Sequence, residues 1–519
     1  MDPLTIIIAA PLAAAGLVAV IPGNYRFLIR VIALLATLLS AAVAIWVFAE
    51  FEPGASGLQF ETRSVWVKSL GIGYHVGLDG VNVGLVLMGA LVAFAAACVS
   101  REIAERVKEY YVLLLLMAGG ILGAFLSWDM FGFYFFHELA LVPTFLMIGI
   151  WGRGDDRVYA TYQITLYLSF GALLVLVGLI AVYVQCGANT FDMVELHRHV
   201  AQTPIPAAAQ RWMFPLLMFG FGVLVSLWPF HSWAPTGYAA APTGVAMLHA
   251  GVIKKFGLLG LIRVALPLLP EGAREWIPVM GVLAVGNLLY GGWVAMRQSD
   301  LNRLLGYSSV AHMGFAFLGL ASLTVLGVTG AVVVMIAHGF LAGLNFALSG
   351  YLRRVAGTTQ MDRMGGLLDK VPFIGALLVM AMLAGCGVPG FANFVGELLV
   401  LFGAWEANKT WVVVAAWAGL VVGAVYTLRA VRTILHGPLR TELATVADPA
   451  GAWHRSAYAL LVVALLLFGV VPGLLIARIE PDAKAVSGTI ATGIEMKAAG
   501  EVGSIVRGAV AAAGVGVRQ

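Results

Sequence analysis

Six ionisable side chains lie inside long apolar stretches of this sequence, where a charge is costly. They are Glu138, Lys254, Lys255, His312, His338 and Glu397. A charged group at the centre of a bilayer costs about 2.5–3.5 kcal/mol on insertion scales, so such residues usually have a partner and a role. Carboxylates, lysines and histidines bind and release protons, and burial can bring that exchange close to neutral pH. The set therefore predicts a route for protons or cations through a membrane.

Structural explanations compete with this interpretation. A lipid-facing lysine extends its ammonium to the membrane interface, and a lone histidine often only bonds a neighbouring helix. Lys254 and Lys255 project about 100° apart on a helix, so they cannot face one cavity equally. His231 and His249 are auxiliary candidates. We expect His231, at a proline-rich break, to bond freed carbonyl groups, and His249 either to join the route or to pack. Arg263 is expected to end its span or to pair with an acid.

The composition is that of a polytopic helical membrane protein. Of 519 residues, 61% are hydrophobic and 11% charged, against about 25% charged in soluble proteins. Cys98, Cys186 and Cys386 have no paired spacing and predict neither a disulfide framework nor a metal site. The sequence offers no glycine-rich phosphate loop and no cysteine cluster for iron and sulfur. Redox or nucleotide chemistry is therefore expected in partner proteins.

Apolar windows of about 20 residues predict an all-α fold with about fourteen transmembrane helices. The expected spans are 4–22, 27–49, 76–99, 110–127, 129–151, 160–185, 212–233, 240–266, 276–296, 302–321, 324–349, 371–403, 411–433 and 456–477.

Two of the spans contain helix breakers. Pro229 and Pro235 interrupt the seventh, and Gly387 and Pro389 interrupt the twelfth. Because these two lie five spans apart, the units around them run in opposite directions, which is typical of inverted-repeat transporters. We therefore predict helices 1–3 over residues 1–109, a first repeat over 110–266, a second repeat over 267–435, and a last helix with a C-terminal tail over 436–519. We assign no function to the tail from about residue 480.

The basic residues predict the orientation of the chain. The odd-numbered connections hold seventeen lysines and arginines, and the even-numbered connections hold six. Because positive loops stay on the cytoplasmic side, the odd connections are expected in the cytoplasm and both termini outside. For a bacterial protein this is a multi-pass arrangement in the cell (inner) membrane.

Several motifs resemble the antiporter-like membrane subunits of respiratory complex I (NADH-quinone oxidoreductase), and most closely its M type. The motifs are DMFGFYFFHELALVPTFLMIGIWG, PFHSWAPTGYAAAPTGVAMLHAGVIKKFGLLGLIR, LLGYSSVAHMGFAFLGL, MIAHGFLAGLNFALSGYLRRVAGTTQMDRMGGL and PGFANFVGELLVLFGAW, within about residues 110–435. The resemblance implies fourteen helices with an inverted repeat. It also implies the glutamate of the fifth helix at Glu138, the lysine of the eighth at Lys255, relay histidines at His312 and His338, and the terminal acid of the twelfth at Glu397; Lys254 is an addition.

One departure from the family concerns the partner of Glu138. The family pairs this glutamate with a lysine of the seventh helix, at the position that Leu224 occupies here, and Thr236 stands where the family has an aspartate. The first half-channel therefore works with another cation, works differently, or does not pump. We expect Lys254 to compensate by approaching Glu138, while Lys255 faces His312.

The resemblance implies a proton-translocating subunit in the membrane arm of an NADH:quinone oxidoreductase. NADH, FMN, iron–sulfur clusters and quinone are then expected in partner subunits, with no cofactor or metal in this chain. The expected partners are L-type and N-type membrane subunits and the lipid bilayer, and no nucleic acid. Two other readings stay open: a homologous subunit of a membrane-bound hydrogenase or multisubunit cation/proton antiporter, and a structural spacer with an inactive first half-channel.

Overall fold

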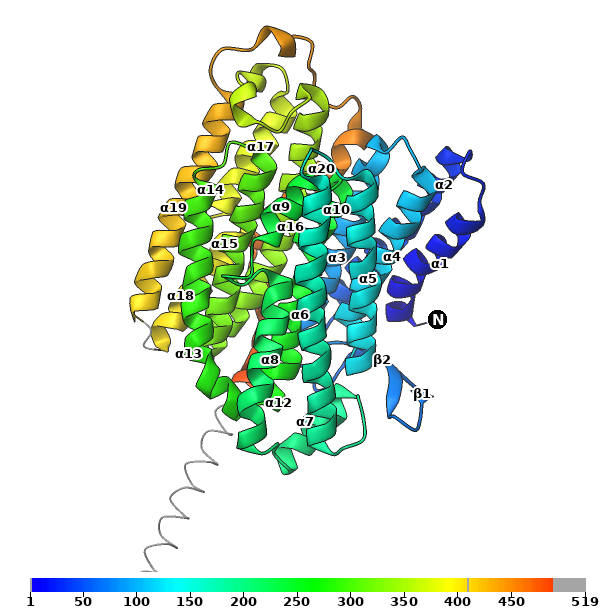
Figure 1. Cartoon of the computed structure of the whole chain (residues 1–519), viewed down its shortest axis with the longest axis vertical. Helices are drawn as coiled ribbons and strands as arrows, with labels where there is room; N and C mark the ends of the chain where they lie inside the picture. The colour runs from blue at the N-terminus through cyan, green and yellow to red at the C-terminus, as the bar shows by residue number, and fades with distance from the viewer. Residues whose placement is uncertain (1, 408–409, 489–519) are drawn as a thin grey trace, which may run out of the picture.

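The computed structural model describes residues 2–407 and 410–488, and these form a bundle of long, roughly parallel helices (Figure 1). Thirteen helices are long and apolar enough to cross a membrane, and the short apolar helix α17 with its continuation α18 adds the broken twelfth span. This agrees with the fourteen predicted spans. The first six spans are α1 (Pro3–Val20), α2 (Arg26–Glu50), α3 (Gly80–Val99, extended by the 3-10 turn Ser100–Glu102), α4 (Val107–Leu126), α5 (Met130–Trp151) and α6 (Arg157–Cys186).

The second half of the bundle contains the interrupted helices. The elements are α8 (Ala207–Val225), α9 (Trp233–Ala240), α10 (Thr243–Leu248), α11 (Lys255–Gly260), α12 (Leu266–Leu268), α13 (Pro270–Gly286), α14 (Gly292–Ala295), α15 (Leu301–Ser322), α16 (Val325–Ala356), α17 (Pro372–Gly385), α18 (Ala392–Glu406), α19 (Thr410–Leu435) and α20 (Ala452–Val470). π-helical turns at His249–Ile253, Leu261–Ala265 and Asn287–Gly291 join the pieces from α10 to α12 and from α13 to α14. The sequence did not predict these wide turns.

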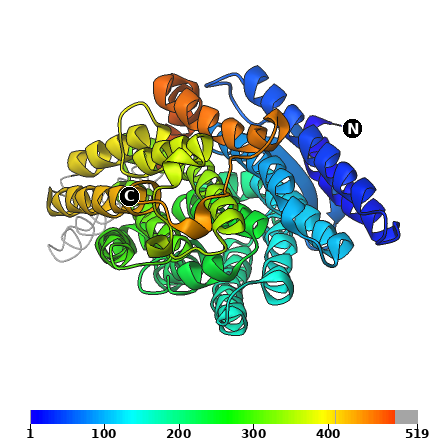
Figure 2. The same cartoon turned by 90° about the horizontal axis from the view of Figure 1, so that it is seen from above.

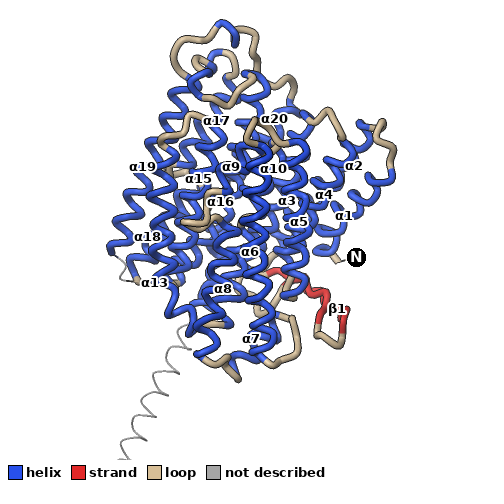
Figure 3. The backbone as a smooth tube through the Cα atoms, in the orientation of Figure 1, coloured by secondary structure: helices blue, strands red, loops and turns tan. Residues whose placement is uncertain are grey.

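Two elements at one end of the bundle were also missed. An antiparallel hairpin of β1 (Gln59–Val67) and β2 (Ile72–Leu78) and the amphipathic helix α7 (Met193–Gln202) lie at the end opposite the arginine-rich connections (Figure 3). His75 of β2 donates to Asp192 Oδ2 at 2.8 Å and lies 2.9 Å from Glu61 Oε1. Burial raises the pKa of Asp192, but its bonds from His75 and the Glu195 amide and the nearby Arg63 outweigh burial and lower it.

The central helices carry most of the ionisable residues predicted for the route. The spans Gly80–Glu102, Thr243–Leu268, Leu301–Ser322 and Val325–Ala356 are almost wholly buried, whereas α1, α2, α6, α13, α19 and α20 keep much of their apolar surface exposed. Figure 2 shows α1 and α2 along one edge of the bundle. An apolar outer surface suits lipid, so the buried centre is where charged groups can be paired.

The two broken spans run in opposite directions, as the repeat prediction requires (Figure 1). The first break follows Ser226, which adopts a left-handed conformation with φ 72°. Asn287 fills the hydrogen-bonding needs of this break: its Nδ2 donates to Ser226 O at 3.0 Å and to Val310 O at 2.9 Å, and its Oδ1 accepts from Trp228 N at 2.6 Å. His231 has a backbone hydrogen bond at Pro229 within this break, as expected, and its Nδ1 has no partner among the described residues.

The helix over residues 473–488 packs against the start of α3. Asp482 Oδ2 accepts from Gly80 N at 2.5 Å, beside Asp79. Arg263 donates to Asp79 Oδ1 at 2.9 Å and lies 4.1 Å from the Trp128 ring centre, which confirms that it pairs with an acid. The predicted tail beyond residue 488 lies outside the described residues.

Asn287→Leu should destabilise the fold by about 2–3 kcal/mol, because it leaves the Trp228 amide and the Ser226 carbonyl group without the partner that Asn287 supplies. Unfolding by a denaturing detergent in mixed micelles measures this. Asn393→Leu is the matched control, because the Asn393 amide is buried with no hydrogen-bond partner among the described residues. Equal losses in the two variants would contradict the role given to Asn287.

Docking of residues 473–488 should weaken as pH rises. Burial, with the neighbouring Asp79, raises the pKa of Asp482 from 3.8 to about 6. Between these values the docked carboxyl keeps a proton that the released carboxyl loses, so docking stability falls as pH rises toward 6 and stays low above it. Hydrogen exchange of residues 473–488 measures this, corrected for the intrinsic effect of pH. Asp482→Asn, which still accepts from Gly80, should be insensitive to pH; an unchanged pH dependence would contradict the assignment.

Candidate proton-conducting site

The two central lysines follow a widened helical turn. In the π-helix His249–Ile253, Lys254 N donates to His249 O at 3.2 Å, a bond that spans five residues. Such turns occur often at functional sites because the extra residue changes the direction of the side chains that follow. Lys254 and Lys255 are both fully buried.

Lys255 is the first of a series of buried polar side chains. Its ammonium donates to Ala250 O at 2.8 Å and to His338 Nδ1 on α16 at 2.8 Å. His338 Nδ1 accepts this bond when its ring is neutral, so a single proton can be held by either group. We predicted that Lys255 would face His312. It instead meets His338 first, and the two histidine rings are 5.5 Å apart.

His312 on α15 is held between two backbone carbonyl groups. Its Nδ1 donates to Ser308 O at 2.7 Å, and its Nε2 donates to Gly385 O at 3.0 Å, at the end of α17. A carbonyl oxygen can only accept, so both bonds form together only when the ring carries two protons. The Nε2 also lies 3.8 Å from Glu397 Oε1, whose negative charge would stabilise that protonated ring.

Glu397 lies in the second turn of α18, directly beyond the break of the twelfth span. Gly387 makes room for it: with φ +69°, a Cβ there would lie 2.7 Å from Glu397 Oε2. Glu397 is buried, and its Oε1 has no hydrogen-bond partner among the described residues. Two cavities of about 10 Å³ adjoin this series of polar side chains, one beside His312 and Glu397 and one beside His312 and His338. Each has the size that one water needs.

The expected compensation by Lys254 is wrong. The Lys254 ammonium donates to Ser309 Oγ on α15 at 3.0 Å and lies 5.7 Å from the centre of the Tyr238 ring. The wide turn directs Lys254 toward α15 and Lys255 toward α16. Glu138 instead forms an ion pair with its neighbour His137, whose Nδ1 lies 3.3 Å from Glu138 Oε1. His249 lies 3.3 Å from the Tyr238 hydroxyl, and its Nε2 has no partner among the described residues.

Glu138 lies at the edge of the chain rather than at its centre. Its side chain is 30% exposed, whereas His137 beside it is buried. The ring of His137 stacks on Phe256 at 3.8 Å, and Phe256 stacks on Phe133 at 4.1 Å. With Phe221 5.8 Å from Phe256, this aromatic cluster takes up space near the buried Leu224, where the family has its lysine.

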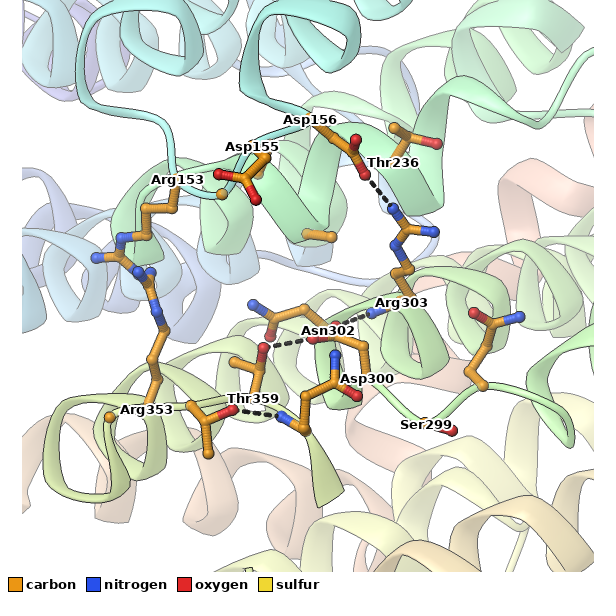
Figure 4. Close-up of a pocket in the computed structure, with 17 residues that line it drawn as sticks. Arg153, Asp155, Asp156, Thr236, Ser299, Asp300, Asn302, Arg303, Arg353 and Thr359 are labelled. Carbon is orange, nitrogen blue, oxygen red and sulfur yellow. Dashed lines mark hydrogen bonds and ion pairs between the residues drawn. The ribbon is translucent and has the colours of Figure 1, made fainter. Parts of the chain in front are cut away.

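A polar pocket of about 570 Å³ opens at the arginine-rich end of the bundle. Figure 4 shows Arg153 and Arg353 on one side of it, and the ion pair of Arg303 with Asp156, at 2.7 Å, on the other. Thr236 lines this pocket, so the missing family aspartate leaves a hydroxyl there.

Small polar residues lead from this pocket inward. Asn302, in the pocket lining, accepts from Ser349 Oγ on α16 at 2.5 Å. Asn345 lies one helical turn from Ser349 and lines the cavity that His338 and His312 share. Asn302, Asn345 and Ser349 were not predicted from the sequence. An amide or a hydroxyl in an apolar helix could have indicated them, because such a group needs a hydrogen-bond partner on another helix.

Comparison with known proteins agrees with this geometry. The family described as NADH:quinone oxidoreductase/Mrp antiporter, TM, matches residues 127–423, which hold the whole route from Glu138 to Glu397. NADH-quinone oxidoreductase subunit M of Rhodobacter capsulatus is 33% identical over 92% of this chain and 95% of its own. F(420)H(2) dehydrogenase subunit M of Methanosarcina mazei is 33% identical over 84% of this chain and 89% of its own.

A solved structure shares the fold. A chain of respiratory complex I from Thermus thermophilus with bound NADH superposes with a TM-score of 0.86 and 30% identity, over 94% of this chain and 99% of that one. The class defined by the fold and the buried chain is the antiporter-like membrane subunit. This chain belongs to the NADH:quinone oxidoreductase/Mrp antiporter family of membrane subunits, and within it to the M type.

Lys255→Met should lower proton transport at least tenfold, because it removes the group that shares a proton with His338. Lys254→Met should lower transport less, because Ser309, its hydrogen-bond partner, is not a link between Lys255 and Glu397. Proton uptake by proteoliposomes that carry the intact complex distinguishes the two variants, and a tenfold change corresponds to about 1.4 kcal/mol. Equal effects would show that the lysines act as one site.

Proposed function

We propose that this chain is the proton-translocating, antiporter-like subunit in the membrane arm of an NADH:quinone oxidoreductase. The observation that carries the proposal is the buried series of side chains from Lys255 through His338 and His312 to Glu397. The Lys255 ammonium lies 2.8 Å from His338 Nδ1, the centres of the two histidine rings are 5.5 Å apart, and His312 Nε2 lies 3.8 Å from Glu397 Oε1. Each member can change protonation, and each neighbour is near enough to change the other's proton affinity.

The polar pocket at the arginine-rich end supplies the entrance. A proton would pass from the pocket along Asn302, Ser349 and Asn345 to the lysine–histidine pair. Because the cavities adjoining His338 and His312 have room for single waters, a short water chain can complete the path between the two rings.

Glu397 acts as the final, controlling group. An ionised Glu397 stabilises the doubly protonated His312, 3.8 Å away. When Glu397 takes up a proton this stabilisation disappears, and His312 is free to return to its neutral form. Charge movement in a neighbouring subunit would drive the cycle by favouring one form of Glu397 over the other.

The first half of the chain works differently from the second. Glu138 has His137 as its partner, and the aromatic cluster of Phe133, Phe221 and Phe256 adjoins that pair. Because a carboxylate facing lipid is costly, a neighbouring subunit must cover the exposed part of Glu138. We infer that this half relays charge between subunits and does not conduct a proton by itself, which keeps the spacer reading for the first half-channel only.

The proposed function also implies which partner subunits and which membrane surround this chain. NADH oxidation, FMN, iron–sulfur clusters and quinone would belong to partner subunits, and L-type and N-type membrane subunits would flank this chain. The excess of seventeen over six basic residues in the odd connections favours an orientation with both termini outside, which in a bacterium is the outer side of the cell membrane.

A second candidate function differs only in the electron donor. The chain is as similar to the archaeal F(420)H(2) dehydrogenase subunit as to the bacterial NADH-dependent one, each at 33% identity. A membrane subunit of this kind can serve either input module. Purification of the intact complex, with assay of NADH and reduced deazaflavin as donors, distinguishes the two.

Glu397→Gln should leave assembly and quinone reduction in place and lower the number of protons moved per electron pair, because it keeps the shape but removes the controlling charge. Glu138→Gln should also lower it, but less, since Glu138 lies outside the buried chain. Both are measured in proteoliposomes, with Glu406→Gln, at the last residue of α18, as the control. Normal stoichiometry in Glu397→Gln would remove this residue from the path, and with it the proposed mechanism.

A further inference from the structure

A second cavity, remote from the proton route, is lined by three arginines. It has a volume of about 360 Å³ at the arginine-rich end of the bundle. Arg30 comes from the first turns of α2, Arg101 from the turn after α3, and Arg354 from the end of α16. The start of α20 adds Trp453 and His454.

No carboxylate lines this cavity, and the described part of the chain supplies none as an ion-pair partner for the three arginines. Arg30 Nη2 donates to backbone carbonyl groups, at 2.8 Å to Ile103 O and 3.4 Å to Arg101 O, and the Arg30 side chain also interacts with the Tyr111 hydroxyl. Arg101 Nη1 lies 3.1 Å from His454 Nε2, so this partner is an imidazole and not a carboxylate. Arg354 lies over the Tyr351 ring at 4.9 Å.

Three other arginines of the described chain show what a neutralised arginine looks like here. Arg153 pairs with Glu102 and Arg303 with Asp156 at the same end of the bundle, and Arg263 pairs with Asp79 at the other. The Nε of Arg30 is buried and has no partner among the described residues. Three unneutralised guanidinium groups in one cavity repel one another, and an anion that fits between them removes that cost. The cavity therefore favours a negatively charged ligand.

The surroundings indicate which anion. Arginine binds phosphate oxygens through paired N–H groups, and basic pockets between transmembrane helices hold the headgroups of acidic lipids. Trp453 is 49% exposed beside the cavity, as tryptophan is where a membrane meets water. Farther along α2 from this end, Leu35, Leu38 and Leu39 are exposed and apolar, which gives acyl chains a surface that runs from Arg30 toward the middle of the helix. A soluble anion would have no use for this surface.

We propose that the cavity of Arg30, Arg101 and Arg354 binds the phosphate of an acidic phospholipid headgroup, with the acyl chains along α2 and Trp453 at the level of the headgroup. The lipid then links α2, α3, α16 and α20, which come from opposite ends of the sequence. This site does not depend on the proposed function, because the proton route uses none of these residues.

The test uses the intact purified complex in nanodiscs of phosphatidylcholine that contain a small fraction of a photoactivatable lipid. Photoactivatable phosphatidylglycerol should label peptides that line the cavity, around residues 449–458, at least fivefold more than photoactivatable phosphatidylcholine does. Inorganic phosphate should not prevent the labelling. The double variant R30Q/R354Q should lose the preference for phosphatidylglycerol, and Arg440→Gln, an arginine at the same end outside the cavity, should keep it.

Three results would overturn the proposal. Equal labelling by the two lipids in the unaltered complex would remove the specificity for acidic lipid. Complete competition by inorganic phosphate would assign the cavity to a soluble anion. An undiminished preference in R30Q/R354Q would place the lipid elsewhere. If that double variant does not assemble, the single variant Arg354→Gln, expected to keep part of the preference, replaces it, while the first two comparisons need no variant.

Discussion

The structure depends on one constraint: a polar group in the apolar interior raises the free energy of the fold unless it has a hydrogen-bond partner, because little water is available to supply one. At both broken helices this need is met by a side chain from another span. Asn287 serves three backbone groups at the first break, and His312 donates to Gly385 at the second. The second partner is itself ionisable, so the group that stabilises the break is also a member of the proton route. In the second half of the chain, the hydrogen bond that stabilises the break is made by a residue of the proposed proton route. In the first half, the break is stabilised by Asn287, which does not belong to that route.

The same constraint explains why the two halves differ in their chemistry. In the second half, Lys255, His338, His312 and Glu397 form one series, and each charge has a neighbour that balances or shares it. In the first half Leu224 leaves no cation to balance a central carboxylate, and aromatic rings pack around Phe256. Glu138 is tolerated because it lies at the edge, next to His137. The first half therefore combines a closed, apolar packing with a single carboxylate at its edge.

Much of this fold could be predicted from the sequence, because apolar length and helix breakers are local properties. The fourteen spans, the two breaks and the buried lysines follow from them. The hairpin of β1 and β2 was missed because its strands are stabilised by distant partners such as Asp192. The direction of Lys254 was wrong because a regular helix was assumed, and the wide turn at His249–Ile253 arises from packing that no local pattern encodes. The exposure of Glu138 depends on which helices surround α5, which hydropathy does not report.

The wide turn at His249–Ile253 has a consequence for how this sequence can change. It holds one residue more than a regular turn, so everything after it is out of phase by about 100° with the helix before it. Loss of any single residue there would restore the phase. With α10 fixed, the wide turn would then close to a regular one, and Lys254 and Lys255 would stay near Ser309 and His338. The segment can therefore absorb the loss of one residue, whereas the loss of two would turn both lysines about 100° away from these partners.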